Sequence, residues 1–437
     1  LYQHTPNERI ATKPPLVGWV SVAFFRVTRS WELAWRLPSF LAAAGIVVVL
    51  LRAGTRAYSP AAGVLAVGAF GLNLWSPRVA MLVRTDMPLA LVVFLLGLGI
   101  FWKIRERGNW GARDRWIVFA LLTAAMLIKG PIVYAFLLPG LVAFQWLRRD
   151  DHVSAWCGWW PWVASLMVFL LWVAGGVAWV PGFYEQVVLR EFAGRFGETV
   201  HRSQPLYFYL PHLLLRFLPW SMLLLGWGIL SCRRTRGRIR QGWRALPPEI
   251  AWLVLWSASG LLVMSLIPSK RFDRLYPILP PLCLLVAAQF SRALRGPRAS
   301  FVRRWSALTL VAAGLLASAH VATNVFASYR GHEDSLVRFG AAVRKKAEKN
   351  GWRYGVIGRN EEGLLLYLRR EHFLEVDDAI RRWQGGELDA LVLPAEKLPA
   401  LREALPDAIP ADLEATINLD QHVRHYLLLR RADPPRD

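Results

Sequence analysis

The sequence predicts a mainly α-helical, polytopic transmembrane bundle followed by a small soluble α/β domain. Composition is the first indication, because 54% of the 437 residues are hydrophobic and 22 are tryptophan, which is too apolar for a soluble protein of this length. The second is that the apolar residues gather in stretches close to the roughly 20 residues that cross a bilayer as a helix. The third is that the Lys and Arg content of the intervening loops alternates between high and low.

Ten apolar stretches predict the spans, and flanking residues that reach the interface compensate for the shorter stretches. Many of the tryptophans lie at the ends of these stretches, where an amphipathic ring sits half in water. We therefore expect a bundle of about ten spans within residues 1–330. In chain order the stretches are Leu37–Leu51, Ala61–Trp75, Met87–Trp102, Trp116–Ile128, Pro131–Leu147, Trp160–Val180, Leu210–Leu230, Ile250–Ile267, Leu275–Phe290 and Trp305–Phe326.

Positive charge orients the predicted bundle. Alternate loops carry 20 Lys and Arg residues in one set and nine in the other. Because basic loops stay in the cytoplasm, the set with nine faces outward, as does the chain after Phe326. Topology and contacts with anionic membrane lipids thus explain the net charge of +22, and no nucleic-acid partner is predicted.

Beyond the last span the pattern changes to short strands and helices. No long apolar stretch occurs from Gly331 onward, so residues 331–437 are expected to form an α/β domain outside the membrane. The predicted elements are helix Ser335–Lys349, strand Tyr354–Ile357, helix Glu362–Arg369, helix Val376–Trp383, strand Ala390–Leu393, helix Ala395–Ala404 and a closing pair, Leu413–Asn418 and Arg424–Leu429.

The start of the chain bears on the topology. It begins at Leu1 without Met or a signal peptide, and no apolar segment precedes Pro14. The topology puts this first segment on the outer side. We therefore expect a further transmembrane helix before Leu1.

Four short charged segments on the outer side are candidates for the functional site, because charge at a membrane boundary is costly unless it is paired or does chemistry. In the first, Thr12–Leu16, two prolines hold the backbone of Lys13 extended and present its ammonium from a stiff turn. The alternative is a lysine that only anchors an interfacial helix by reaching to the membrane surface.

The second segment places Asp86 at the head of a span, with Arg84 as its predicted partner. The alternative is an ion pair that merely caps the helix. Lys129 lies in the outward turn before Gly130 and Pro131, where it either joins the site or marks the interface.

The third segment is the loop Pro181–Pro205, whose apolar residues recur at helical spacing. This spacing predicts an amphipathic segment on the surface that covers a cavity. His201 with Glu191 or Glu198 is its candidate for a divalent metal, but one histidine with no second at ligand spacing does not support a metal site.

The fourth segment, Ser269–Pro281, holds Lys270, Arg271 and Arg274 together with Asp273. Lys supplies a point charge and Arg a bidentate fork, and both suit phosphate. So much positive charge in an outer loop opposes the topology rule, which favours a functional origin. Together the segments predict a basic, carboxylate-bearing pocket at the outer surface, and a lipid-linked phosphate is the ligand that fits it.

The motifs, in order, resemble a known family. They are KPPL with a following GW, RTDMPL, LIKGP, EFAGRF followed by H and QP, YFYL with LPW, and SKRFDRLYPILPP. Across nearly the whole chain this order resembles the membrane glycosyltransferases of the GT-C fold, in the branch that includes protein O-mannosyltransferases and the bacterial aminoarabinose transferase of lipid A. The resemblance implies an enzyme of the bacterial inner membrane. It would move a sugar from polyprenyl (undecaprenyl) phosphate to a lipid, glycan or protein acceptor at the periplasmic face, with inversion.

The resemblance also implies roles for particular residues. Asp86 is the catalytic acidic residue within this chain, while the family's principal aspartate is expected upstream of Leu1. The donor phosphate is expected to contact six residues, namely Lys13, Arg84, Arg195, Lys270, Arg271 and Tyr276. Additional candidates are Lys129, Glu191, His201, Asp273 and Arg274.

Two departures from the aminoarabinose transferases concern metal binding. Thr12 stands where they have Glu, and Phe192 follows Glu191 where they have His. Both argue against their metal site and their sugar. The sequence therefore predicts no certain cofactor, and a divalent metal is an alternative that it does not support. Two other functions remain as alternatives. A transporter or flippase for lipid-linked sugars would be expected to show inverted repeats and broken helices at mid-membrane, and an oligosaccharide polymerase or ligase to gather its arginines in one large loop.

Overall fold

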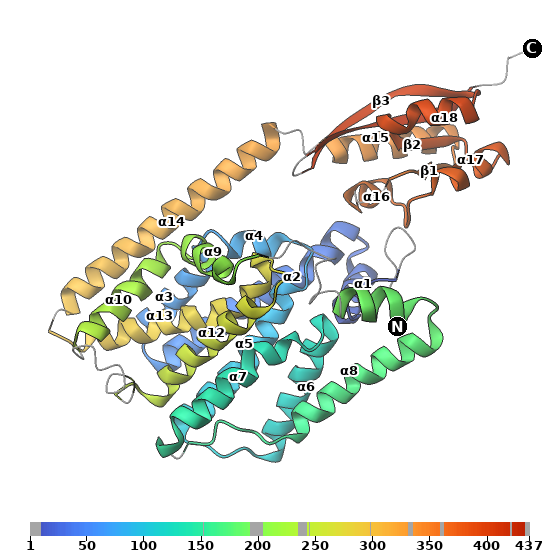
Figure 1. Cartoon of the computed structure of the whole chain (residues 1–437). Helices are drawn as coiled ribbons and strands as arrows, with labels where there is room; N and C mark the ends of the chain where they lie inside the picture. The colour runs from blue at the N-terminus through green and yellow to red at the C-terminus, as the bar shows by residue number, and fades with distance from the viewer. Residues whose placement is uncertain are drawn as a thin grey trace, which may run out of the picture. The chain divides into compact units, whose positions relative to one another are not determined.

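The computed structural model describes residues 10–151, 153–192, 204–234, 243, 245–297, 299–330, 335–358, 362–419 and 422–432. The chain divides into two compact units, Ala11–Ala319 and His320–Asp437. The first is built from helices, coloured blue to orange in Figure 1, and the second holds a four-stranded sheet. The division falls within the long helix α14 (Ala299–Arg330), so the predicted boundary at residue 331 stays a prediction.

The ten predicted apolar stretches all fall on helical elements, nine of them in the first unit and the tenth on α14, which crosses the division. Helix α3 ends at Gly71, short of the predicted Trp75, and several others extend beyond the predicted bounds. In chain order the elements before α14 are α1 (Leu16–Thr28), α2 (Trp31–Ala57), α3 (Pro60–Gly71), α4 (Ser76–Met81), α5 (Asp86–Glu106), α6 (Ala112–Lys129), α7 (Ile132–Leu147), η1 (Arg149–Asp151), α8 (Trp160–Trp179), η2 (Tyr184–Phe192), η4 (Leu206–Phe208), α9 (Tyr209–Arg216), α10 (Trp220–Arg234), α12 (Pro248–Leu266), η5 (Phe272–Ile278) and α13 (Leu279–Leu294).

The helices confirm a polytopic membrane protein, but not the number of spans. Within the described residues, six helices are long and apolar enough to cross a membrane, and the bent pair α9 and α10 makes seven if it is one span. Helices α1, α3 and α7 are apolar but shorter. The expected count of about ten therefore stays a prediction.

One predicted span, Leu210–Leu230, is wrong as a continuous helix. The structure has α9 and α10 in its place, bent by 110° at a short break. Pro219 lies in this break, and proline ends a helix because it lacks the N–H donor and clashes with the preceding turn. Arg216, the last residue of α9, lies beside the loop that leads to α4, since its carbonyl accepts a hydrogen bond from the Leu74 N–H at 3.0 Å.

Helix α5 lies in the core of the first unit and contacts α2, α6, α7, α12 and α13. Its contact with α12 is close because Gly97 leaves room for the fully buried ring of Trp256. A Cβ at residue 97 would lie 2.2 Å from that ring. The Trp252 indole donates to the Gly97 carbonyl at 2.9 Å. This packing fixes α5, whose first residue is Asp86.

The second unit packs helices against both faces of a sheet. Strands β1 (Tyr354–Val356) and β2 (Ala390–Pro394) are parallel, and β4 (His422–Arg431) pairs antiparallel with both β2 and β3 (Ala408–Leu419), giving the order β1-β2-β4-β3. One apolar cluster joins one face of the sheet to α15 (Ser335–Asn350) and α16 (Glu362–Leu368). Another joins the opposite face to α17 (Val376–Gln384) and α18 (Leu398–Ala404), which follows the short η6 (Ala395–Lys397). Every predicted strand and helix of this unit is present.

Candidate functional site

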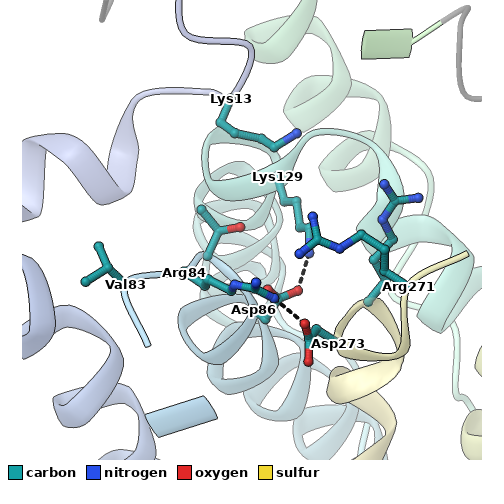
Figure 2. A pocket seen from close by; sticks show the side chains of 9 residues that line it. Lys13, Val83, Arg84, Asp86, Lys129, Arg271 and Asp273 are labelled. Atoms are coloured by element: carbon teal, nitrogen blue, oxygen red, sulfur yellow. Dashed lines mark hydrogen bonds and ion pairs between the residues drawn. The ribbon is translucent and has the colours of Figure 1, made fainter. Parts of the chain in front are cut away.

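A cavity of about 240 Å³ lies where four separate segments of the first unit meet. They are the segment before α1, the start of α5, the end of α6 and the segment around the start of η5. Figure 2 shows the charged side chains that point into it. The lining residues are Lys13, Val83, Arg84, Thr85, Asp86, Lys129, Arg271, Asp273 and Arg274.

Local sequence explains how each segment presents its charge. Pro14 and Pro15 follow Lys13 directly and restrict its backbone. Asp86 is in the first turn of α5, where the partial positive charge of a helix N-terminus favours a carboxylate. Lys129 is in the last turn of α6, where the opposite partial charge favours a cation, and Gly130 with φ 76° turns the chain immediately after it.

Two ion pairs join these segments, and Figure 2 marks both with dashed lines. Asp86 pairs with Lys129, and their side chains are only 7% and 9% exposed. Asp273 pairs with Arg84, which is 35% exposed, while Asp273 is 7% exposed. Breaking a buried pair is costly because it leaves one charge without compensation. Each pair therefore ties two distant parts of the chain together at the cavity.

The predicted partner of Asp86 was wrong. Arg84 is two residues away along the chain, and residues at that spacing do not face each other at the start of a helix. Helix α6 packs against α5 and brings Lys129 to Asp86 instead. Arg84 turns to Asp273, and the Ser39 hydroxyl of α2 donates to its carbonyl at 3.1 Å.

Positive charge exceeds negative charge in this cavity. Five cationic and two acidic side chains line it, which leaves three positive charges in excess. Within the described part of the chain, Arg271 has no carboxylate partner. Arg274 donates to the carbonyl and hydroxyl oxygens of Ser269 at 2.7 and 3.3 Å, which fixes its guanidinium within its own loop. Such an excess suits a phosphate group, because Arg and Lys form charge-assisted hydrogen bonds with its oxygens.

Two residues predicted for the donor site are not among those that line the cavity. Lys270 is buried, and its ammonium donates to the Gln204 carbonyl at 2.8 Å. Burial lowers the pKa of Lys270 below its ordinary value. Tyr276 is fully buried, and its hydroxyl donates to Ser76 Oγ at 2.9 Å. Both contacts are structural in this conformation, and a role in donor binding stays a prediction for each.

The third predicted segment is described only in part. Phe183 and Val187 are buried, as the helical spacing predicted for an amphipathic segment. Arg195, Glu198 and His201 lie outside the described residues, and Glu191 is in η2 without a described side chain. The structure therefore tests neither the phosphate contact of Arg195 nor the metal candidate.

The sequence reasoning also missed several features of this site. Val83 and Thr85 line the cavity beside the predicted charges, and their place next to Arg84 and Asp86 was the available signal. Nothing in the sequence indicated that Lys270 would donate to the Gln204 carbonyl, because every residue has a carbonyl oxygen.

No family model matches the chain. Three similar relatives are undecaprenyl phosphate-alpha-4-amino-4-deoxy-L-arabinose arabinosyl transferases. The one from Shewanella sediminis is 27% identical over 165 residues, which is 37% of this chain and 28% of the relative. The one from Pseudomonas paraeruginosa is 32% identical over 209 residues, 46% of this chain and 35% of the relative. The one from Aeromonas hydrophila is 25% identical over 367 residues, which is 78% of this chain and 61% of the relative. The chain thus spans about a third of the length of the first two relatives.

Solved structures extend the likeness to the fold of nearly the whole chain. ArnT from Cupriavidus metallidurans bound to undecaprenyl phosphate superposes with a TM-score of 0.68 and 17% identity, covering 97% of this chain and 90% of that one. The apo state of the same protein gives a TM-score of 0.57 and 20% identity, covering 95% and 87%. In sequence the chain is similar to the ArnT-like transferases, and in structure it has their polytopic GT-C fold.

Proposed function

We propose that this protein is a glycosyltransferase that moves a sugar from a polyprenyl phosphate carrier to an acceptor at the outer face of the bacterial inner membrane. One observation carries the proposal. Charged residues as far apart in the chain as Lys13 and Arg274 line one cavity, where cations outnumber carboxylates. The lining combines four segments that are far apart in the chain and holds more Lys and Arg than Asp, a composition that suits the oxygens of a phosphate group.

The excess cations have a defined task in such a reaction. When the bond between the sugar and the carrier breaks, the electron pair stays on the phosphate oxygen and negative charge builds there. Lys13, Arg271 and Arg274 stabilise that charge more strongly in the transition state than in the bound donor. We assign these three residues to the leaving phosphate.

Asp86 has a different task. Its ion pair with Lys129 holds its carboxylate at the cavity. An ionised carboxylate stabilises the positive charge that develops on the sugar carbon as the bond breaks, in the manner of glycosidases. We assign Asp86 to this role and Lys129 to holding it in position.

The relatives support the carrier more than the sugar. Their names specify undecaprenyl phosphate and an aminoarabinose. We carry over the carrier, because a phosphate group accounts for the basic lining. The sugar is not carried over, since Thr12 and Phe192 depart from the aminoarabinose transferase pattern. The excess of Lys and Arg in the opposite set of loops supports the periplasmic orientation of the cavity.

Mass spectrometry of envelope glycolipids tests the proposal. The wild-type strain is compared with a deletion strain and with strains carrying Asp86→Asn or, as a control away from the cavity, Arg303→Gln. We expect one glycosylated product to disappear in the deletion and Asp86→Asn strains and to persist in the control. Unchanged products in the deletion strain would refute the enzyme, and unchanged products in Asp86→Asn alone would refute the role of that residue.

A further inference from the structure

A further cationic side chain lies against η5, the element that contributes Asp273 and Arg274 to the cavity. Arg216, the last residue of α9, places its guanidinium over the ring of Phe272 at 3.8 Å from the centroid. Contact with a ring face uses none of the five N–H donors of arginine. Within the described residues, no carboxylate forms an ion pair or hydrogen bond with Arg216. The side chain is thus positioned but has donors to spare.

A second positive charge, that of Arg78, acts on Arg216. Arg78 of α4 is exposed, and it interacts electrostatically with Arg216, as does Asp273. Asp273 is already paired with Arg84, so it does not balance both arginines. A second positive charge that acts on Arg216 strengthens the attraction of this region for an anion. Neither Arg78 nor Arg216 lines the cavity described above.

The backbone around the two arginines is fixed before any ligand binds. The Leu74 N–H donates to the carbonyl of Arg216 at 3.0 Å. The Trp220 indole donates to the Leu72 carbonyl, also at 3.0 Å. These bonds tie the end of α9 to the loop that leads into α4. A binding group on a fixed backbone loses less entropy when its ligand binds.

Helix α9 indicates what kind of molecule carries the anion. His212 and Arg216 are four residues apart and share one face, and the His212 ring stacks on Phe272 with centroids 6.0 Å apart. Leu210 and Leu215 are 49% and 60% exposed on the rest of the helix. An arginine and exposed leucines on one short helix suit a ligand with an anionic head and apolar chains.

We propose that Arg216 and Arg78 form a second phosphate-binding subsite, separate from the donor cavity, that takes the phosphate group of a membrane lipid. Phe272 is the platform that orients the Arg216 guanidinium. The apolar chains of the lipid lie along Leu210 and Leu215. The subsite goes beyond the proposed transfer reaction and does not depend on it.

Native mass spectrometry of the full chain measures the lipid that it retains after extraction from phosphatidylcholine bilayers with and without phosphatidylglycerol. The variants are Arg216→Gln and Arg78→Gln, with Arg304→Gln as the matched control, because Arg304 is an exposed arginine of α14. We expect Arg216→Gln to retain roughly tenfold less phosphatidylglycerol, Arg78→Gln to lose less, and the control to match the wild type. Equal retention by Arg216→Gln and Arg304→Gln would overturn the subsite.

Three further measurements test whether the loss of lipid comes from misfolding, whether the bound phosphate belongs to a lipid, and whether the subsite is separate from the donor cavity. Arg216→Lys keeps the charge without the fork, so intermediate retention supports the subsite, whereas retention equal to Arg216→Gln contradicts it. Competition by inorganic phosphate as strong as by phosphatidylglycerol would refute a lipid source. Undecaprenyl phosphate binding should fall in Arg271→Gln and persist in Arg216→Gln. Loss of both ligands in Arg216→Gln would refute a separate site, while failure of every form to bind undecaprenyl phosphate would refute only the proposed donor.

Discussion

The two ends of helix α5 hold ion pairs of the same chemistry in opposite settings. At its start, Asp86 and Lys129 are 7% and 9% exposed, beside a cavity with excess positive charge. Near its end, Lys103 pairs with Asp114 at 2.7 Å, and these side chains are 23% and 33% exposed. The comparison teaches that the ion pair itself does not mark a site. The two ends differ in the burial of the pair and in the excess of cationic side chains that line the cavity beside the first.

The largest expected effect comes from Asp86→Asn, which keeps the shape of the side chain but removes its charge. Sugar transfer should fall roughly a thousandfold, in the range of other catalytic carboxylates. Release of undecaprenyl phosphate by the complete protein measures the rate. Asp114→Asn, at the far end of the comparison, should stay within about twofold of the wild type. A similar loss in both variants would remove the distinction between the two ends.

Replacing the lysine of each ion pair compares how much the two pairs stabilise the fold. Lys129→Ala leaves the buried Asp86 carboxylate without a partner and should destabilise the fold by about 3 kcal/mol. Lys103→Ala, at the more exposed pair, should cost about 1 kcal/mol or less. Thermal unfolding of the purified protein in one detergent compares the two. Equal shifts of the unfolding temperature would show that burial does not determine how much each ion pair stabilises the protein.

A charge exchange tests whether the Arg84–Asp273 pair positions the site. Arg84→Asp and Asp273→Arg should each weaken undecaprenyl phosphate binding by about tenfold, because the surrounding loops lose their link. The double variant restores the pair in reverse and should recover part of the affinity. If the double variant loses as much binding free energy as the two single variants together, the two residues act independently.

The smallest effect concerns pH at the far end of α5. The hydrogen bond from Lys103, with one from the Gly111 N–H, lowers the pKa of Asp114 below its ordinary value. A lowered folded-state pKa means that the stabilisation is present above the unfolded-state value and is lost as the pH falls through the folded-state value. Acidification below about pH 4 should therefore loosen the start of α6 in the wild type.

Hydrogen exchange of the first amides of α6 measures this loosening. In Asp114→Asn the same amides should exchange faster at neutral pH and change little on acidification. An unchanged acid response in this variant would assign the effect to another group.

The elements of this fold were predictable because their causes are local. A span such as α5 is visible as an apolar run of membrane length, since the bilayer sets the length and forces the backbone to bond within the helix. In the second unit, β2 is visible as a short apolar run, and all five of its residues are buried. The break between α9 and α10 was missed because the apolar run continues on both sides of Pro219.

The features of the candidate site also divide into those that the sequence predicted and those that only the tertiary structure shows. Sequence alone predicted charged residues that line the cavity, because each stands out against an apolar neighbourhood, as Lys13, Asp86 and Arg271 do. Only the tertiary structure decided the pairing of Asp86 with Lys129 and of Arg84 with Asp273. It also placed Lys270 and Tyr276 in structural contacts away from the cavity lining. Helix periodicity and membrane length act within about 20 residues, whereas an ion pair depends on which helices pack together and which way each side chain faces.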